Sequence, residues 1–151
     1  MTQDIQIPNF LELEASEALH RIIQLMLARM AHILGVEDAP EVTYNSHTND
    51  SFVLKLATND NLCESFAYGK QFGNYDDWTK VANEFGYEHI QREGGGEGGT
   101  EYVEGVFIIL GQMFITNWRY YSGEGYDYDD IASCVDYAKP VQVTETQYTR
   151  V

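Results

Sequence analysis

The strongest pattern along the chain is a pair of apolar runs within residues 103–120, separated by Gly111-Gln112. A glycine at the first central position of a two-residue loop favours a type II′ turn, because that position requires a positive φ. The pattern therefore predicts a β-hairpin in which Leu110 faces Met113. Both faces of this hairpin are apolar near the turn, so we expect each to be covered by a helix, another layer or a second subunit.

Counting outward from this turn gives an expected register for the whole hairpin. Ile109 then faces Phe114. Further from the turn, Glu104 faces Arg119 in an opposite-charge pair of the kind that stabilises neighbouring strands. The register is consistent with residues 103–120 forming the central pair of a larger sheet.

A second pattern, at helical spacing, runs from about residue 10 to residue 34. Asn9 followed by Glu12 resembles a capping box, and Gly35 stands where a left-handed residue commonly ends a helix. Polar side chains interrupt the stretch on one side, so it is typical of a core helix and not of a membrane span. We expect this helix to cover one face of the sheet.

Shorter patterns fill the rest of the chain. Phe52, Leu54 and Leu56 alternate with other residues, which predicts a strand at 51–57 after a first strand at 42–44. The other expected elements are a short helix at 60–68, a helix capped by Asn74 and ended by Gly86, a strand at 87–93, a loop at 122–130 and a strand at 139–149. The predicted fold is a single α+β domain, 1–151, beginning with an extended arm at 1–8. An antiparallel sheet of four to six strands packs on the long N-terminal helix, with a second, shorter helix beside it.

Charge is the most unusual feature of the composition. The chain of 151 residues has 24 acidic and 9 basic residues, a formal net charge of −15. The first 70 residues carry 10 acids and 4 bases and the last 81 carry 14 and 5, so the charge belongs to the folded body and not to a tail. Such a surface repels nucleic acids and anionic membranes and attracts basic protein surfaces. Acidity that only maintains solubility is the alternative interpretation.

The two cysteines, Cys63 and Cys134, set no disulfide framework, and the N-terminal sequence has no pattern typical of a secretory signal. We therefore expect reduced thiols and a cytoplasmic location, with no membrane contact.

No motif in the chain predicts catalysis, a cofactor or a metal. The glycine run at 94–99 lacks the Lys-Ser/Thr of a phosphate-binding loop and is flanked by glutamates, which would repel phosphate. The four histidines have no metal-ligand spacing. Cys63 has no neighbouring base that would make it a nucleophile. We therefore predict a protein that is not an enzyme and holds no cofactor.

The carboxylates fall into three groups interleaved with aromatic residues. A solvated acidic face would explain them, and so would a surface that copies the phosphates of DNA and uses aromatic residues as anchors. The predicted partner-binding residues are Asp76, Asp77, Glu93, Glu97, Glu101, Tyr102, Glu124, Tyr126, Asp127, Tyr128, Asp129 and Asp130.

The last third of the chain carries a resemblance. The string GGGEGGTEYVEGVFIILGQMFITNWRYYSGEGYDYDD resembles a hairpin module of small uncharacterised accessory proteins of tailed bacteriophages. Their pattern is roughly Gly-Gly-Glu-Gly-x-Gly-Glu-x-Tyr, a hairpin, and then Tyr-Tyr-Ser-x-x-Gly. Here it corresponds to Gly95–Tyr102, with one glycine shifted, and to Tyr120–Gly125. The resemblance implies a phage accessory product, a class in which small acidic proteins are often inhibitors of host or defence enzymes.

Together these features favour an inhibitor, located in the infected host cytoplasm, that binds a nucleic-acid-handling protein through an acidic surface and does not itself bind nucleic acid. A homodimer is the alternative to a complex with a different protein. The alternatives are a protein that sequesters a small molecule or nucleotide signal, and a structural or oligomeric phage component.

Overall fold

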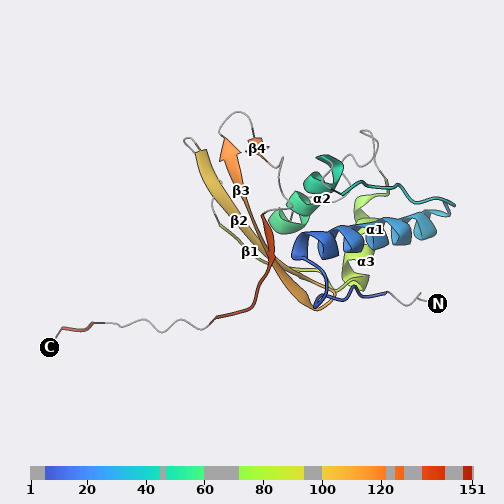
Figure 1. The fold of residues 1–151 in the computed structure, drawn as a ribbon. Coiled ribbons are helices and arrows are strands. Elements are labelled where there is room, and N and C mark those ends of the chain that lie inside the picture. Colours follow the sequence, from blue (N-terminus) through green and yellow to red (C-terminus); the bar gives the residue numbers. More distant parts are fainter. Residues whose placement is uncertain are drawn as a thin grey trace.

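A layer of helices packs on one face of an antiparallel sheet in the computed structural model (Figure 1). The structure describes residues 6–44, 47–59, 72–93, 100–121, 125–127, 134–141 and 148–150. The described helices are α1 (Ala15–Leu34), α2 (His47–Thr58) and α3 (Tyr75–Glu84). The described strands are β1 (Glu88–Glu93), β2 (Thr100–Ile109), β3 (Gln112–Tyr121), β4 (Gly125–Asp127) and β5 (Val135–Tyr137). The predicted α+β class and the long first helix are confirmed.

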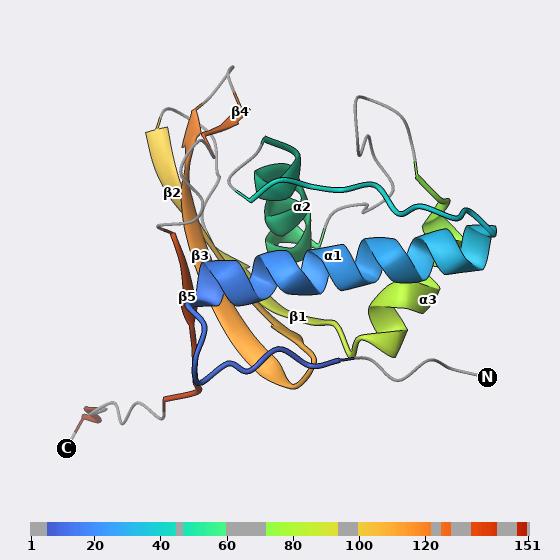
Figure 2. The same cartoon turned by 45° about the vertical axis from the view of Figure 1, so that its right-hand side comes forward.

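The sheet is built around the β2–β3 hairpin. Its strand order is β1-β2-β3-β4, and β5 pairs with β3 beside β4, with every pairing antiparallel. Figure 2 shows α1 and α2 lying across one face of this sheet, with α3 beneath α1. The hairpin is therefore the central pair, as predicted.

The hairpin turn differs from the predicted turn by one residue. Leu110 and Gly111 occupy its two central positions with φ of 50° and 77°, the pattern of a type I′ turn. Phe107 consequently pairs with Phe114, a register shifted by two residues from the expected one. The twist of a type I′ turn matches that of the strands, and the Leu110 N–H donates to the Phe85 carbonyl over 2.7 Å.

The shift changes the partners in the hairpin but keeps every residue on its predicted face, because side chains alternate with a period of two. Glu104 pairs with Asn117, and Arg119 pairs with Tyr102. The predicted pairing of Glu104 with Arg119 is therefore wrong.

Helix α1 begins five residues later than predicted. The Asn9 side chain accepts a hydrogen bond from the Leu11 N–H over 3.1 Å, so it closes a turn before the helix rather than capping it. Gly35 ends the helix with φ of 70°, as predicted. The apolar face of α1 is fully buried over most of its length. Within the described part of the chain, no helix has the length and apolarity needed to cross a membrane.

Helix α2 replaces the strand predicted at 51–57, and the strand predicted at 42–44 is not formed. The buried residues Phe52, Val53, Leu56 and Ala57 recur at helical spacing and face the core. A short run that is apolar on nearly all sides fits a buried helix as well as a strand, and periodicity alone does not distinguish the two. Residues 42–44 form a connection without regular structure.

Two side chains of the sheet layer complete the C-terminal end of α2. Tyr87 donates from its hydroxyl to the Leu56 carbonyl, and His89 Nε2 lies 3.0 Å from the Ala57 carbonyl oxygen. A carbonyl only accepts, so Nε2 carries the proton. These contacts satisfy helix carbonyls that have no partner within the helix.

Helix α3 begins as predicted. The Asn74 side chain accepts from the Asp77 N–H over 2.8 Å and caps it. Trp78 is buried, stands edge-on to Phe52 and donates from its indole N–H to the Phe72 carbonyl.

The remaining predictions have mixed outcomes. The strand expected at 87–93 is β1, whereas residues 125–127 of the expected loop form β4. Residues 138–141 and 148–150, at the two ends of the last predicted strand, are not in a strand. The helix expected at 60–68 lies outside the described residues.

Replacing Glu84 by glutamine should lower the free energy of unfolding at neutral pH by up to about 1 kcal/mol. Arg29 of α1 donates to both Glu84 carboxylate oxygens, over 2.6 and 3.1 Å. These hydrogen bonds hold the pKa of Glu84 below its ordinary value. The stabilisation from a carboxyl group with a lowered pKa is fully present above the pKa that this group has in the unfolded chain. It is lost as pH falls through the pKa of the group in the folded protein.

The difference between the wild type and Glu84→Gln should therefore shrink on acidification, which urea melts across a pH series would measure. Glu17→Gln is the matched control, because Glu17 pairs with Arg21 over 3.4 Å with both side chains about half exposed. A difference that persists in acid, or an equal effect in the control, would contradict this account of the Arg29–Glu84 pair.

Candidate partner-binding surface

The two faces of the sheet differ sharply. Gly105, Phe107 and Ile109 of β2 and Phe114 and Thr116 of β3 are buried beneath the helices. The residues that alternate with them form the opposite face, here called the outer face. Figures 1 and 2 place all three described helices on the other side of the sheet.

The centre of the outer face is apolar. Val106 pairs with Ile115, and Ile108 pairs with Met113 in the next row. Val106 is buried among its neighbours, and the other three side chains are half-buried. We call these four residues the aliphatic strip.

Four acidic positions lie along three sides of the aliphatic strip and form what we call the acidic border. Glu88 of β1 pairs with Ile108, and Asp136 of β5 pairs with Ile115. Both of these side chains are exposed. Glu93 and Glu104 lie in the next pair of outer-face positions beyond Val106. The basic residue Arg119 lies in the outer-face pair after that, opposite Tyr102.

Glu93 and Glu104 are direct partners in the register of β1 and β2. Like charges placed directly opposite in a sheet are destabilising. This pair therefore does not contribute to local stability. A function that uses negative charge would explain why two glutamates stand opposite each other.

Several predicted partner-binding residues gather at the same end of the sheet. Glu101 and Tyr126 both pair with Tyr120, and Tyr102 and Asp127 both pair with Arg119. The register thus brings together residues from the end of β1, the start of β2 and β4, beside the Glu93–Glu104 row. We call Glu93, Glu101, Glu104 and Asp127 the hairpin-end acids. By strand alternation, the positions of Glu93, Glu104 and Asp127 belong to the outer face and that of Glu101 to the opposite face.

Asp76 and Asp77 lie elsewhere, in the first turn of α3. Carboxylates there interact favourably with the positive end of the helix, which gives these two residues a structural role. The pictures place α3 away from β4 and the open end of the hairpin (Figure 2). The predicted residues Glu97, Glu124, Tyr128, Asp129 and Asp130 lie outside the described residues.

Sequence reasoning predicted Glu93 of β1 but missed Glu88 of the same strand and Asp136 of β5. Glu88 and Asp136 are isolated acids in the sequence, and only strand pairing brings them to one surface. The alternation of apolar and polar residues along β5 was a signal for Asp136. Val135 and Tyr137, on either side of it, face the helix layer, so Asp136 faces the opposite way. The Tyr137 hydroxyl donates to the Leu13 carbonyl over 2.7 Å, and burial raises its pKa, so this end of β5 is fixed to the start of α1.

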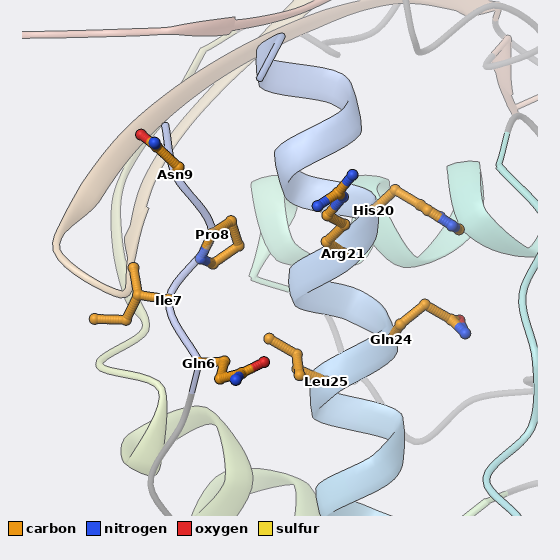
Figure 3. A pocket seen from close by; sticks show the side chains of 8 residues that line it. All are labelled: Gln6, Ile7, Pro8, Asn9, His20, Arg21, Gln24 and Leu25. Atoms are coloured by element: carbon orange, nitrogen blue, oxygen red, sulfur yellow. The ribbon is translucent and has the colours of Figure 1, made fainter. Parts of the chain in front are cut away.

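A groove of about 830 Å³ lies between the N-terminal arm and α1 (Figure 3). Its lining has no carboxylate, in contrast to the outer face. It consists of Gln6, Ile7, Pro8, Asn9, His20, Arg21, Gln24 and Leu25.

The polar side chains of this groove have partners within the protein. His20 Nδ1 lies 3.0 Å from Asn49 Oδ1, and the Gln24 side chain accepts from the Val42 N–H over 3.0 Å. Figure 3 shows both side chains pointing away from the arm. Arg21 pairs with Glu17. A phosphate in this groove would have to compete with Glu17 for the guanidinium of Arg21, the one arginine in the lining. The groove therefore does not favour a nucleotide.

The described residues contain no group of three or more His, Cys, Asp or Glu side chains that could hold a metal ion. No protein-family model matches the chain, and comparison with curated proteins and with solved structures gives no match either.

Proposed function

We propose that this protein is a non-enzymatic inhibitor that binds a nucleic-acid-handling protein through its acidic surface. The observation that carries the proposal is the convergence of Glu93, Glu101, Glu104 and Asp127 at one end of the sheet, where Arg92 and Arg119 are the basic positions in the described register. Strand pairing fixes the spacing of these four acidic positions along the sheet. A basic groove that holds DNA or RNA offers the matching charge.

The chemistry of such a contact has two components. Carboxylates take the place of phosphates against Lys and Arg of the partner and speed the encounter by long-range attraction. Tyr102, at an outer-face position, supplies an aromatic contact typical of protein interfaces, and Tyr126 lies at the same end of the sheet on the opposite face. At a net charge of −15, direct binding to nucleic acid is disfavoured.

The resemblance to accessory proteins of tailed phages supports a setting for this activity. An inhibitor produced during infection acts in the host cytoplasm on a host or defence protein. The Glu93–Glu104 pairing fits this view, because a repulsive contact is retained more readily where a partner's cation relieves it on binding.

The double substitution Glu93→Gln, Glu104→Gln should slow association with the partner by about tenfold or more at low salt, because charge steers the encounter. It should also leave stability unchanged or raise it by about 0.2–1 kcal/mol, because a like-charge pair is removed. The partner is first isolated by affinity capture from host lysate, and association rates are then measured across a salt series. Urea melts give the stability.

Glu37→Gln, Asp38→Asn is the matched control, since these exposed acids follow α1 and lie away from the sheet. It removes the same charge and should leave the association rate nearly unchanged. Competition with DNA or RNA for the partner completes the test. Equal effects of the two double variants, or simultaneous binding of nucleic acid and inhibitor to the partner, would overturn the proposed mimicry.

A further inference from the structure

The aliphatic strip points to a second component of the interface, distinct from the hairpin-end acids. A sheet face with apolar residues at its centre is normally packed against another layer. The described helices occupy the opposite face (Figures 1 and 2). Val106, Ile108, Met113 and Ile115 thus form an apolar area with acidic positions on three of its sides.

We propose that the outer face binds an amphipathic helix of a partner protein, with apolar residues along one side and Lys or Arg on both flanks. This inference rests on the proposed function and deepens it by naming the chemistry of the partner segment. The charge of the acidic border, the edges of the sheet and the width across its strands support it.

The acidic border excludes a second copy of this chain as the favoured occupant. In a two-fold dimer formed through this face, the same patch is used by both subunits. Glu88, Glu104 and Asp136 would then approach the same acids of the other copy, in a protein of net charge −15. Like charges across an interface disfavour the complex, whereas a cationic partner satisfies the border.

The edges of the sheet favour binding to its face rather than addition of a strand. On one side, β1 carries an irregularity between His89 and Gln91, and such bulges protect an edge from further pairing. On the other side, the edge is formed by β4 and β5, which are three residues long each, and such short edge strands offer little for a further strand to pair with. The face therefore offers the more accessible surface.

The dimensions of the surface suit a single helix. Neighbouring strands lie about 4.8 Å apart, so the positions of Glu88 on β1 and Asp136 on β5 are separated by about 14 Å across the sheet. An α-helix with its side chains is about 10–12 Å wide. A helix lying on the strip therefore has a carboxylate near each flank, within reach of long Lys or Arg side chains.

The probe is an 18-residue synthetic helix with leucines on one face and lysines on both flanks, titrated into the full chain with labelled isoleucine and methionine methyl groups. We expect the methyl signals of Ile108, Met113 and Ile115 to shift first. Ile115→Thr, which keeps a β-branched side chain, should weaken binding at least tenfold. Glu88→Gln, Asp136→Asn, which leaves the strip intact, should weaken binding and reduce its salt dependence.

Val36→Thr is the matched control for Ile115→Thr, because Val36 is an exposed valine beyond the end of α1. A peptide of scrambled sequence is the control for composition. Equal binding by the scrambled peptide, or unchanged binding in both outer-face variants, would overturn the proposal. So would a dimer seen by sedimentation that Ile115→Thr dissociates, because the occupant would then be a second copy.

These experiments distinguish a failure of the inhibitor proposal from a failure of the helix-binding proposal. If nucleic acid competes with this protein for the captured partner, but Ile115→Thr does not weaken binding of that partner, the inhibitor proposal stands and the helix site is wrong. If the peptide and the partner both require the aliphatic strip but nucleic acid does not compete, the helix site stands and the mimicry is wrong.

Discussion

Replacing Phe107 by alanine should lower the free energy of unfolding by about 3–5 kcal/mol, the cost of removing a fully buried aromatic ring. Phe107 has no exposed surface and stacks on Phe114, with ring centroids 5.7 Å apart and planes 22° apart. Tyr87 also contacts it, at a centroid distance of 6.1 Å. The substitution would leave a cavity where the central strands meet the helix layer, and urea melts would measure the loss.

Ile108→Ala is the neighbouring control. Ile108 is on the outer face and half-buried, so its truncation should open no enclosed cavity and should cost clearly less. A loss below about 1 kcal/mol for Phe107→Ala would place Phe107 at the periphery and contradict the central position of the hairpin. Equal losses in the two variants would indicate that a further layer covers the outer face.

The hairpin was predictable because its information is local. Alternation along residues 103–120 determines which side chains share a face, and a register error of two residues preserves that assignment. The turn type was less predictable, since Leu110 adopts a positive φ that its side chain disfavours. The hydrogen bond from Leu110 to Phe85, which helps hold the turn, joins residues that are distant in the sequence.

Helix α2 was not predictable, because the decision between helix and strand is made by tertiary contacts. Phe52 and Leu56 fit both patterns. Tyr87 and His89, about thirty residues away, satisfy the last carbonyls of the helix. The candidate surface also depends on tertiary structure, because only the pairing of β1, β2, β3 and β5 brings Glu88 and Asp136 to one face of the sheet.

Helix α2 approaches the sheet closely at Gly105, and Gly105→Ala should cost about 3 kcal/mol, at the upper end of the usual cost of overpacking. A Cβ at this position would lie 2.5 Å from the Ala57 carbonyl oxygen and 2.7 Å from the Ala57 Cβ. The carbonyl belongs to the backbone, so α2 itself would have to move. In an unobstructed strand the same change would have the opposite sign, because alanine is favoured over glycine by about 0.5–1 kcal/mol.

The double variant Gly105→Ala, Ala57→Gly separates the two contacts. Ala57→Gly removes the Cβ but leaves the carbonyl oxygen, so it should recover little of the stability lost in Gly105→Ala. Alone, it should cost about 1 kcal/mol, as expected for glycine in a helix. Urea melts of the four proteins form a double-mutant cycle. Full rescue would assign the close approach to the side chain of Ala57, and a gain in stability for Gly105→Ala would show that α2 does not reach β2.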